Sequence, residues 1–310
     1  VCCLPIALIS VIMTFANMID MLTVNPCIKT AMKASPHTFN SLLSDKLTTD
    51  MLPNFIYGSY TGLAVTVFGL VPTLTAMFGK SILPSLAESC AKNDKKAMQS
   101  GLTKMLIVTS IIAIPAGMGI AVLSEHILRF LFGSRETEIQ VCIMPMSILG
   151  IAVIFLAIAT PCFSILQTLG KPHKAIIIML AGGIIKLFLN IILIRQPIIN
   201  ISGAAISTLV SEVFICVLSV RSVCKMTDLK PKVSEIFVKP TYAAIMCSVT
   251  AVLSHETLTK IAHLQINHRF VTLFSIGIGS TMYFFCLYLL CETPKNIVNY
   301  IFSKKNPQNP

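Results

Sequence analysis

The chain has 310 residues, of which 55% are hydrophobic and 12% are charged, and its formal net charge is +11. Soluble domains carry roughly 25% charged residues, so this composition excludes an ordinary soluble domain and favours a chain whose solvent is mostly lipid. The basic residues lie between apolar runs and form no single patch, so the positive charge does not indicate nucleic-acid binding.

Eight apolar windows approach or exceed the roughly 20 residues that a helix needs to span a membrane. No strand-like alternation of useful length occurs in the sequence. We therefore predict an all-α, polytopic membrane helix bundle of about eight transmembrane helices. In chain order the windows are residues 1–24, 54–78, 105–123, 139–169, 175–194, 203–220, 240–253 and 271–291.

Prolines lie well inside the second, third and fourth windows. Pro72 predicts a kink in the second window, and Pro115 lies inside the third. The fourth window is longer than a single span needs, and we expect Pro145 and Pro161 to break or tilt it.

A polar, basic segment, residues 85–106, separates the second window from the third. Its apolar residues are spaced as in a short interfacial helix, which would be capped near Asn93 or Asp94. A plain basic loop that leads into the third window is the alternative.

The loops indicate an orientation. Fifteen of the 24 lysines and arginines follow the second, fourth, sixth or eighth window, and eight lie in the other loops. By the positive-inside rule, the even-numbered loops and the C-terminus are cytoplasmic. The chain has no tryptophan, so we expect tyrosines to anchor it at the membrane interface: Tyr57, Tyr60, Tyr242 and Tyr300.

Eleven cysteines are scattered through the chain without a CxxC pair or a Cys/His cluster. A free cysteine behaves as a small hydrophobic residue, so packing is the expected role. We predict no metal site and no cofactor.

Strongly polar residues inside the windows are few, and they would be costly in lipid unless they faced the protein interior. On each of three predicted helices, two polar residues lie three or four positions apart and therefore share a helix face. The three pairs lie at matched depths in the membrane. We predict a polar cluster from Asn17 and Asp20 in the first window, Lys186 and Asn190 in the fifth, and Thr208 and Glu212 in the sixth.

Lys186 lies about 16 Å and 12 Å from the two ends of its window at about 1.5 Å per residue, so its ammonium cannot easily reach an interface. We expect Asp20 or Glu212 to neutralise it. Depth favours Glu212, and packing allows either carboxylate.

Four segments resemble one family when their order and spacing are taken together. They are PTLTAMFGKSILPSLAES (72–89), IPAGMGIAVLSEHILRFLFGS (114–134), LQTLGKPHKA (166–175) and NISGAAISTLVSE (200–212). They resemble the stage V sporulation protein B and lipid II flippase branch of the polysaccharide exporters, in the multidrug/oligosaccharidyl-lipid/polysaccharide superfamily. The resemblance covers most of residues 1 to about 225, and the last two windows match no motif.

Family members have two six-helix lobes around a central cavity, usually followed by two extra helices, fourteen in all. The resemblance implies that residues 1–225 form the second lobe and that residues 226–310 form two additional helices and a basic cytoplasmic tail. It also implies an N-terminal lobe that is missing from this chain, which begins inside an apolar run.

Some members bind a cation between the counterparts of the first, fifth and sixth windows. The resemblance matches Asp20, Asn190 and Thr208 to that site. Lys186 departs from the pattern, and its ammonium can stand in for a metal ion, so no sodium site is predicted.

The function that the resemblance implies is that of a flippase in the bacterial cytoplasmic membrane, with membrane lipids and a polyprenyl-pyrophosphate-linked saccharide as partners. A drug/cation antiporter of the same superfamily and an inactive or structural half-transporter are the alternatives. A membrane-embedded glycosyltransferase would need an acid/base pair or metal ligands, and the chain has no HExxH or DxD motif, so we predict no enzyme.

Overall fold

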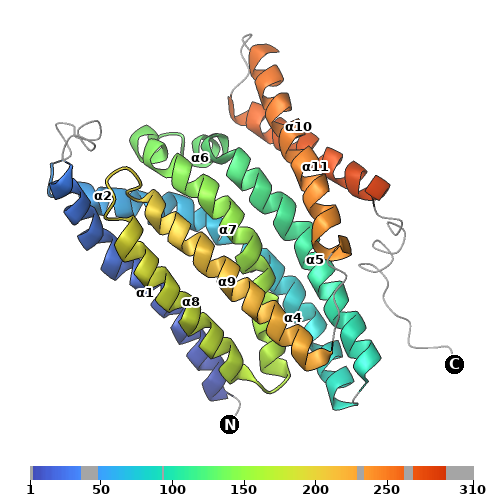
Figure 1. The fold of residues 1–310 in the computed structure, drawn as a ribbon. Coiled ribbons are helices and arrows are strands. Elements are labelled where there is room, and N and C mark those ends of the chain that lie inside the picture. The colour runs from blue at the N-terminus through green and yellow to red at the C-terminus, as the bar shows by residue number, and fades with distance from the viewer. Residues whose placement is uncertain (1–2, 36–47, 93, 229–233, 262–267, 291–310) are drawn as a thin grey trace.

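The computed structural model describes residues 3–35, 48–92, 94–228, 234–261 and 268–290. Every regular element within these ranges is a helix, so the predicted all-α fold class is confirmed (Figure 1). The first half of the elements are α1 (Cys3–Ala34), α2 (Leu52–Ser59), the π-helix η2 (Tyr60–Val65), α3 (Thr66–Phe68), α4 (Leu70–Ala91) and α5 (Lys95–Val122). The second half are α6 (Ser124–Phe132), α7 (Glu136–Thr168), α8 (Pro172–Leu193), α9 (Ser202–Thr227), η3 (Ser234–Val238), α10 (Lys239–Ile261) and α11 (His268–Leu290).

Seven segments of the described chain are long and apolar enough to cross a membrane. They coincide with the second to the eighth predicted windows. The first window, 1–24, falls within α1, and the structure describes side chains there only from residue 18 onward. The segments run from Leu52 to Ala91, Lys95 to Val122, Glu136 to Thr168, Pro172 to Leu193, Ser202 to Thr227, Ile236 to Lys260 and Phe270 to Leu289.

The prediction of a short interfacial helix within residues 85–106 is wrong. Helix α4 continues to Ala91, and α5 begins at Lys95, so the segment is shared between two spanning helices. The predicted cap is present, because Asp94 accepts a hydrogen bond of 3.0 Å from the backbone N–H of Ala97. An N-cap carboxylate satisfies one of the N–H groups that the first helical turn leaves without a partner.

The fourth window forms one helix, α7, which contains both Pro145 and Pro161. The expected break at these prolines is therefore absent from α7. Helix α7 is also the centre of the bundle, since it packs against α4, α5 and α9. A long helix that is buried against several neighbours can tolerate a missing backbone donor, because packing rather than the individual hydrogen bond stabilises it.

Two glycines let α5 and α7 approach closely. A Cβ atom on Gly150 would lie 2.8 Å from the Cα of Ala121 and 2.9 Å from the carbonyl oxygen of Gly117. Ser147 stabilises the same helix contact by donating a 2.7 Å hydrogen bond to the Ala121 carbonyl oxygen. The two backbones are thus in direct contact, as small residues permit in membrane helix pairs.

The remaining helices pack at the two sides of this centre (Figure 1). Helix α8 packs against α9 and α1, while α10 packs against α11 and α5. Helices α1 and α8 run in the same direction and α9 runs in the opposite one (Figure 1). This arrangement puts the outer halves of α1, α8 and α9, as the topology prediction defines them, at the same end of the bundle.

Candidate functional site

A buried ion pair joins α1 to α8. The ammonium Nζ of Lys186 lies 2.7 Å from Oδ2 of Asp20, and both side chains are only 11% exposed. The sequence left Asp20 and Glu212 as alternative partners and depth favoured Glu212, but the structure pairs Lys186 with Asp20. Removing two charges from water is costly, so such a pair is tolerated only when its geometry is good and its remaining polar atoms are bonded.

Asn190 supplies the bonds that this pair needs. Its amide Nδ2 donates to Oδ1 of Asp20 at 2.9 Å and to Oγ1 of Thr23 at 3.1 Å. Its Oδ1 accepts a hydrogen bond from the hydroxyl of Ser207. Asn190 is fully buried, and it therefore links α1, α8 and α9 through a single amide group.

The other predicted members take different positions. Thr208 is 4% exposed, and its hydroxyl donates to the carbonyl oxygen of Ala204 at 2.8 Å on its own helix. The charge of Lys186 acts on Glu212, but Oε2 of Glu212 is buried and has no hydrogen-bond partner within the described chain. The backbone of Asn17 belongs to α1, and its side chain lies outside the described residues.

Three residues of the cluster were missed by sequence reasoning. Thr23 and Ser207 are hydrogen-bond partners of Asn190, but hydroxyl residues are common in membrane helices and give no distinct signal. Tyr60 is 1% exposed and its phenol contacts the side chain of Thr208. The prediction that Tyr60 anchors the chain at the interface is therefore wrong, and its place in a short π-helix points it into the bundle.

The two other described tyrosines of that prediction differ from Tyr60. Tyr57 is half-buried and within electrostatic reach of Asp20, while Tyr242 is 63% exposed. Tyr300 lies outside the described residues.

An apolar groove lies between α5, α7, α9 and the start of α10. Its volume is about 640 Å³, and Ile114, Ile154, Phe155 and Val217 are among the side chains that line it. Arg221 is the charged residue in this lining. Because Arg221 lies near the end of α9, the groove has one basic end and an otherwise apolar wall.

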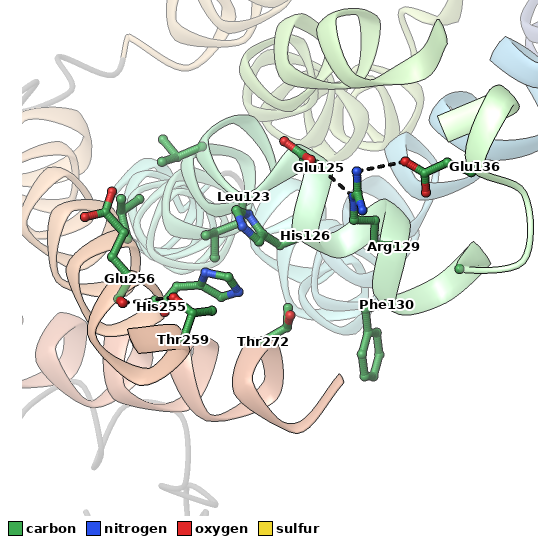
Figure 2. Close-up of a pocket in the computed structure, with 13 residues that line it drawn as sticks. Leu123, Glu125, His126, Arg129, Phe130, Glu136, His255, Glu256, Thr259 and Thr272 are labelled. Atoms are coloured by element: carbon green, nitrogen blue, oxygen red, sulfur yellow. Dashed lines mark hydrogen bonds and ion pairs between the residues drawn. The ribbon is translucent and has the colours of Figure 1, made fainter. Parts of the chain in front are cut away.

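A second cavity, of about 690 Å³, lies between α6 and the α10–α11 pair (Figure 2). Its lining is partly apolar but includes titratable side chains: His126, Arg129 and Glu125 on α6 and His255 and Glu256 on α10. Arg129 is held between two carboxylates, with Nε 3.1 Å from Oε1 of Glu125 and Nη2 2.8 Å from Oε1 of Glu136.

These observations define a multi-pass integral membrane protein whose bundle buries a hydrogen-bonded polar network. Its fold resembles solved transporters. A MATE transporter in its bent conformation superposes with a TM-score of 0.52 and 18% identity, covering 92% of this chain and 68% of that one. A multidrug and oligosaccharidyl-lipid superfamily transporter from Pyrococcus furiosus superposes with a TM-score of 0.51 and 15% identity, covering 90% of this chain and 68% of that one.

The family described as Lipid II flippase MurJ matches residues 8–273, and the chain belongs to this family. Stage V sporulation protein B of Bacillus subtilis is 22% identical over 184 residues, which cover 58% of this chain and 34% of that protein. The lipid II flippase MurJ of Bacillus subtilis is 26% identical over 136 residues, covering 44% and 25%.

An archaeal relative is similar over a comparable stretch. The probable low-salt glycan biosynthesis flippase Agl15 of Haloferax volcanii is 26% identical over 186 residues, covering 59% of this chain and 38% of that protein. The matched part of this chain thus spans about a third of the length of these curated relatives.

Proposed function

We propose that this chain is the C-terminal part of a flippase that moves a polyprenyl-linked saccharide of the lipid II type across the bacterial cytoplasmic membrane. The observation that carries the proposal is the family match over residues 8–273. Curated relatives named as flippases support it. Residues 1–225 form the six-helix second lobe, and residues 226–310 form two additional helices and a basic tail on the cytoplasmic side.

The apolar groove supports a substrate with a long lipid tail. Its wall is formed by aliphatic and aromatic side chains, and Arg221 supplies a positive charge at one end. A polyprenyl chain would fill the apolar part, because burial of apolar surface is favourable in proportion to its area. The pyrophosphate of such a lipid is an anion that an arginine binds well.

The buried polar network has a separate role in this proposal. Lys186 places its ammonium group between α1, α8 and α9, against Asp20 and beside Asn190. The resemblance implies that some relatives hold a cation between the corresponding helices, where the ion would supply the positive charge. The ammonium of Lys186 therefore serves as a built-in counter-ion that couples the three helices without a metal.

A flipping assay on the complete transporter tests the function. The full-length protein is reconstituted into vesicles, and the movement of a fluorescent polyprenyl-pyrophosphate saccharide between leaflets is followed. We expect protein-dependent flipping. Export of cationic drugs without lipid flipping would instead support an antiporter, and a folded protein that moves neither substrate would support a structural role.

A C-terminal reporter fusion tests the topology independently. A reporter that is active only in the cytoplasm should be active when it is fused after residue 310. Activity of a reporter that works only outside the cytoplasm would reverse the proposed orientation.

A further inference from the structure

The rings of two histidines are in contact in the lining of the second cavity (Figure 2). His126 lies on α6 and His255 on α10, and their ring centroids are 3.8 Å apart with an interplanar angle of 58°. His255 is 8% exposed and His126 is half-buried. Nδ1 of His126 is buried and has no hydrogen-bond partner within the described chain. The contact therefore joins the lobe to the additional helices through two titratable rings.

The geometry does not suit a shared metal ion. Two imidazoles that bind one ion at about 2.0–2.1 Å would hold their ring centres roughly 5 Å apart. The observed rings are closer and lie partly against each other. Within the described residues, no group of three or more histidine, cysteine or acidic side chains is placed to hold a metal.

The charged groups around the two rings are distributed over three helices. Helix α6 contributes Glu125 and Arg129, α7 contributes Glu136, and α10 contributes Glu256 beside His255. Arg129 is already paired with Glu125 and Glu136. Helices α5 and α11 add uncharged residues, Val122 and Thr272, to the cavity lining.

Burial lowers the pKa of His126 below its ordinary value, Glu125 acts in the opposite direction, and the charge of Arg129 lowers it further. The half-buried site therefore disfavours the charged form of His126. A group whose pKa is lowered in the closed arrangement stabilises that arrangement above its ordinary pKa, which is 6.5 for histidine. That stabilisation is lost as the pH falls below this value.

We infer that the His126–His255 contact is a pH-sensitive latch at the outer end of the bundle, which opens when both imidazoles become protonated. Two imidazolium rings at this separation repel each other strongly in a half-buried site. Opening would separate the α10–α11 pair from α6 and widen the cavity to outer-side water. The assignment of this cavity to the outer side rests on the topology given under the proposed function.

Hydrogen–deuterium exchange of the complete transporter in lipid nanodiscs tests the latch without any transport readout. Peptides covering α6 and the last turns of α10 are compared at pH 7.5 and pH 5.5, with labelling times scaled for the pH dependence of chemical exchange. We expect at least about a tenfold increase in exchange in these peptides at pH 5.5. An unchanged scaled rate would overturn the inference.

Three variants make the test specific. The double variant His126→Gln/His255→Gln should show the same scaled exchange at both pH values, because it cannot acquire charge. The double variant His126→Lys/His255→Lys carries both charges at pH 7.5 and should show at that pH the fast exchange that the wild type shows at pH 5.5. His173→Gln removes an exposed histidine on α8 and should keep the wild-type response.

A full pH response in the double glutamine variant would also overturn the inference. Flipping activity is not measured, so a failed latch and a failed flippase assignment give different results.

Discussion

Lys186 and Asp20 are separated by 166 residues in the sequence, yet Nζ of one lies 2.7 Å from Oδ2 of the other in the buried part of the bundle. This contact joins α1 to α8 at a depth where neither side chain can exchange its partner for bulk water. The cost of burying each charge is offset only while both are present.

Lys186→Met should destabilise the complete transporter by about 3–5 kcal/mol, because it leaves the Asp20 carboxylate buried without a counter-ion. Asp20→Asn in the same background should recover most of that loss. The free energy of unfolding in detergent micelles measures both. Lys96→Met, at an exposed lysine, should change it by less than about 0.5 kcal/mol. Losses that simply add in the double variant would contradict the pair.

Asn190→Leu should cost about 1–3 kcal/mol, because Oδ1 of Asp20 and the hydroxyls of Thr23 and Ser207 lose a partner in a buried site. The matched control is Asn54→Leu, which removes an exposed hydrogen bond of 3.0 Å to Asn25. That change should be close to neutral in the same unfolding measurement. Equal effects of the two variants would mean that Asn190 is not the hub of the network.

Gly150→Ala should destabilise the fold by about 1–3 kcal/mol, because the added Cβ would collide with the backbone of α5. Gly119→Ala lies on α5 itself, where a Cβ meets nothing within 4 Å. That control should be neutral or stabilising by up to about 1 kcal/mol, since alanine favours a helix over glycine. Thermal unfolding of the two variants separates the effect of contact from that of helix propensity.

Asp94→Ala should weaken the start of α5 by about 0.5–2 kcal/mol, since the N–H of Ala97 loses its capping carboxylate. Asp94→Asn keeps an acceptor at the same place and should be nearly neutral. Hydrogen–deuterium exchange of the first turn of α5 reports the effect locally. Equal exchange in the alanine and asparagine variants would mean that the Asp94 side chain does not stabilise the start of α5.

Flipping by the complete transporter should be unchanged when sodium is replaced by choline on both sides of the vesicle membrane. The reason is that Lys186 already provides the positive charge between α1, α8 and α9. Lys186→Gln should reduce flipping, and comparison of the wild type with this variant in both salts measures the ion dependence of the rate. A wild-type rate that requires sodium would contradict the role of Lys186 as a counter-ion.

The sequence predicted the spanning helices well because a long apolar window has few other stable forms in lipid. It placed Lys186, Asn190 and Asp20 in one cluster because helix direction and residue depth can be counted. It did not determine the partner of Lys186, since depth says nothing about how each helix is rotated. Glu212 has a suitable depth, but α8 turns the ammonium toward α1.

Other features lack a sequence signal altogether. Ser207 and Thr208 are neighbours of similar chemistry, and both donate to the carbonyl oxygen of Ala204 on their own helix. Only the packing of α9 decides that Ser207 also bonds Asn190. Helix α6 has nine residues and no window of its own. The place of Tyr60 inside the bundle depends on the π-helical turn that begins there, which the sequence did not indicate.

The glycine crossing of α5 and α7 also has a mechanical consequence. Because Gly117 and Gly150 bring the two backbones into contact and Ser147 bonds Ala121, neither helix can slide along the other without breaking that fit. Helix α6 connects their ends, so we expect the three helices to move as one rigid unit. A hinge that opens the outer cavity must then lie in the α10–α11 pair, which packs against this unit through α5.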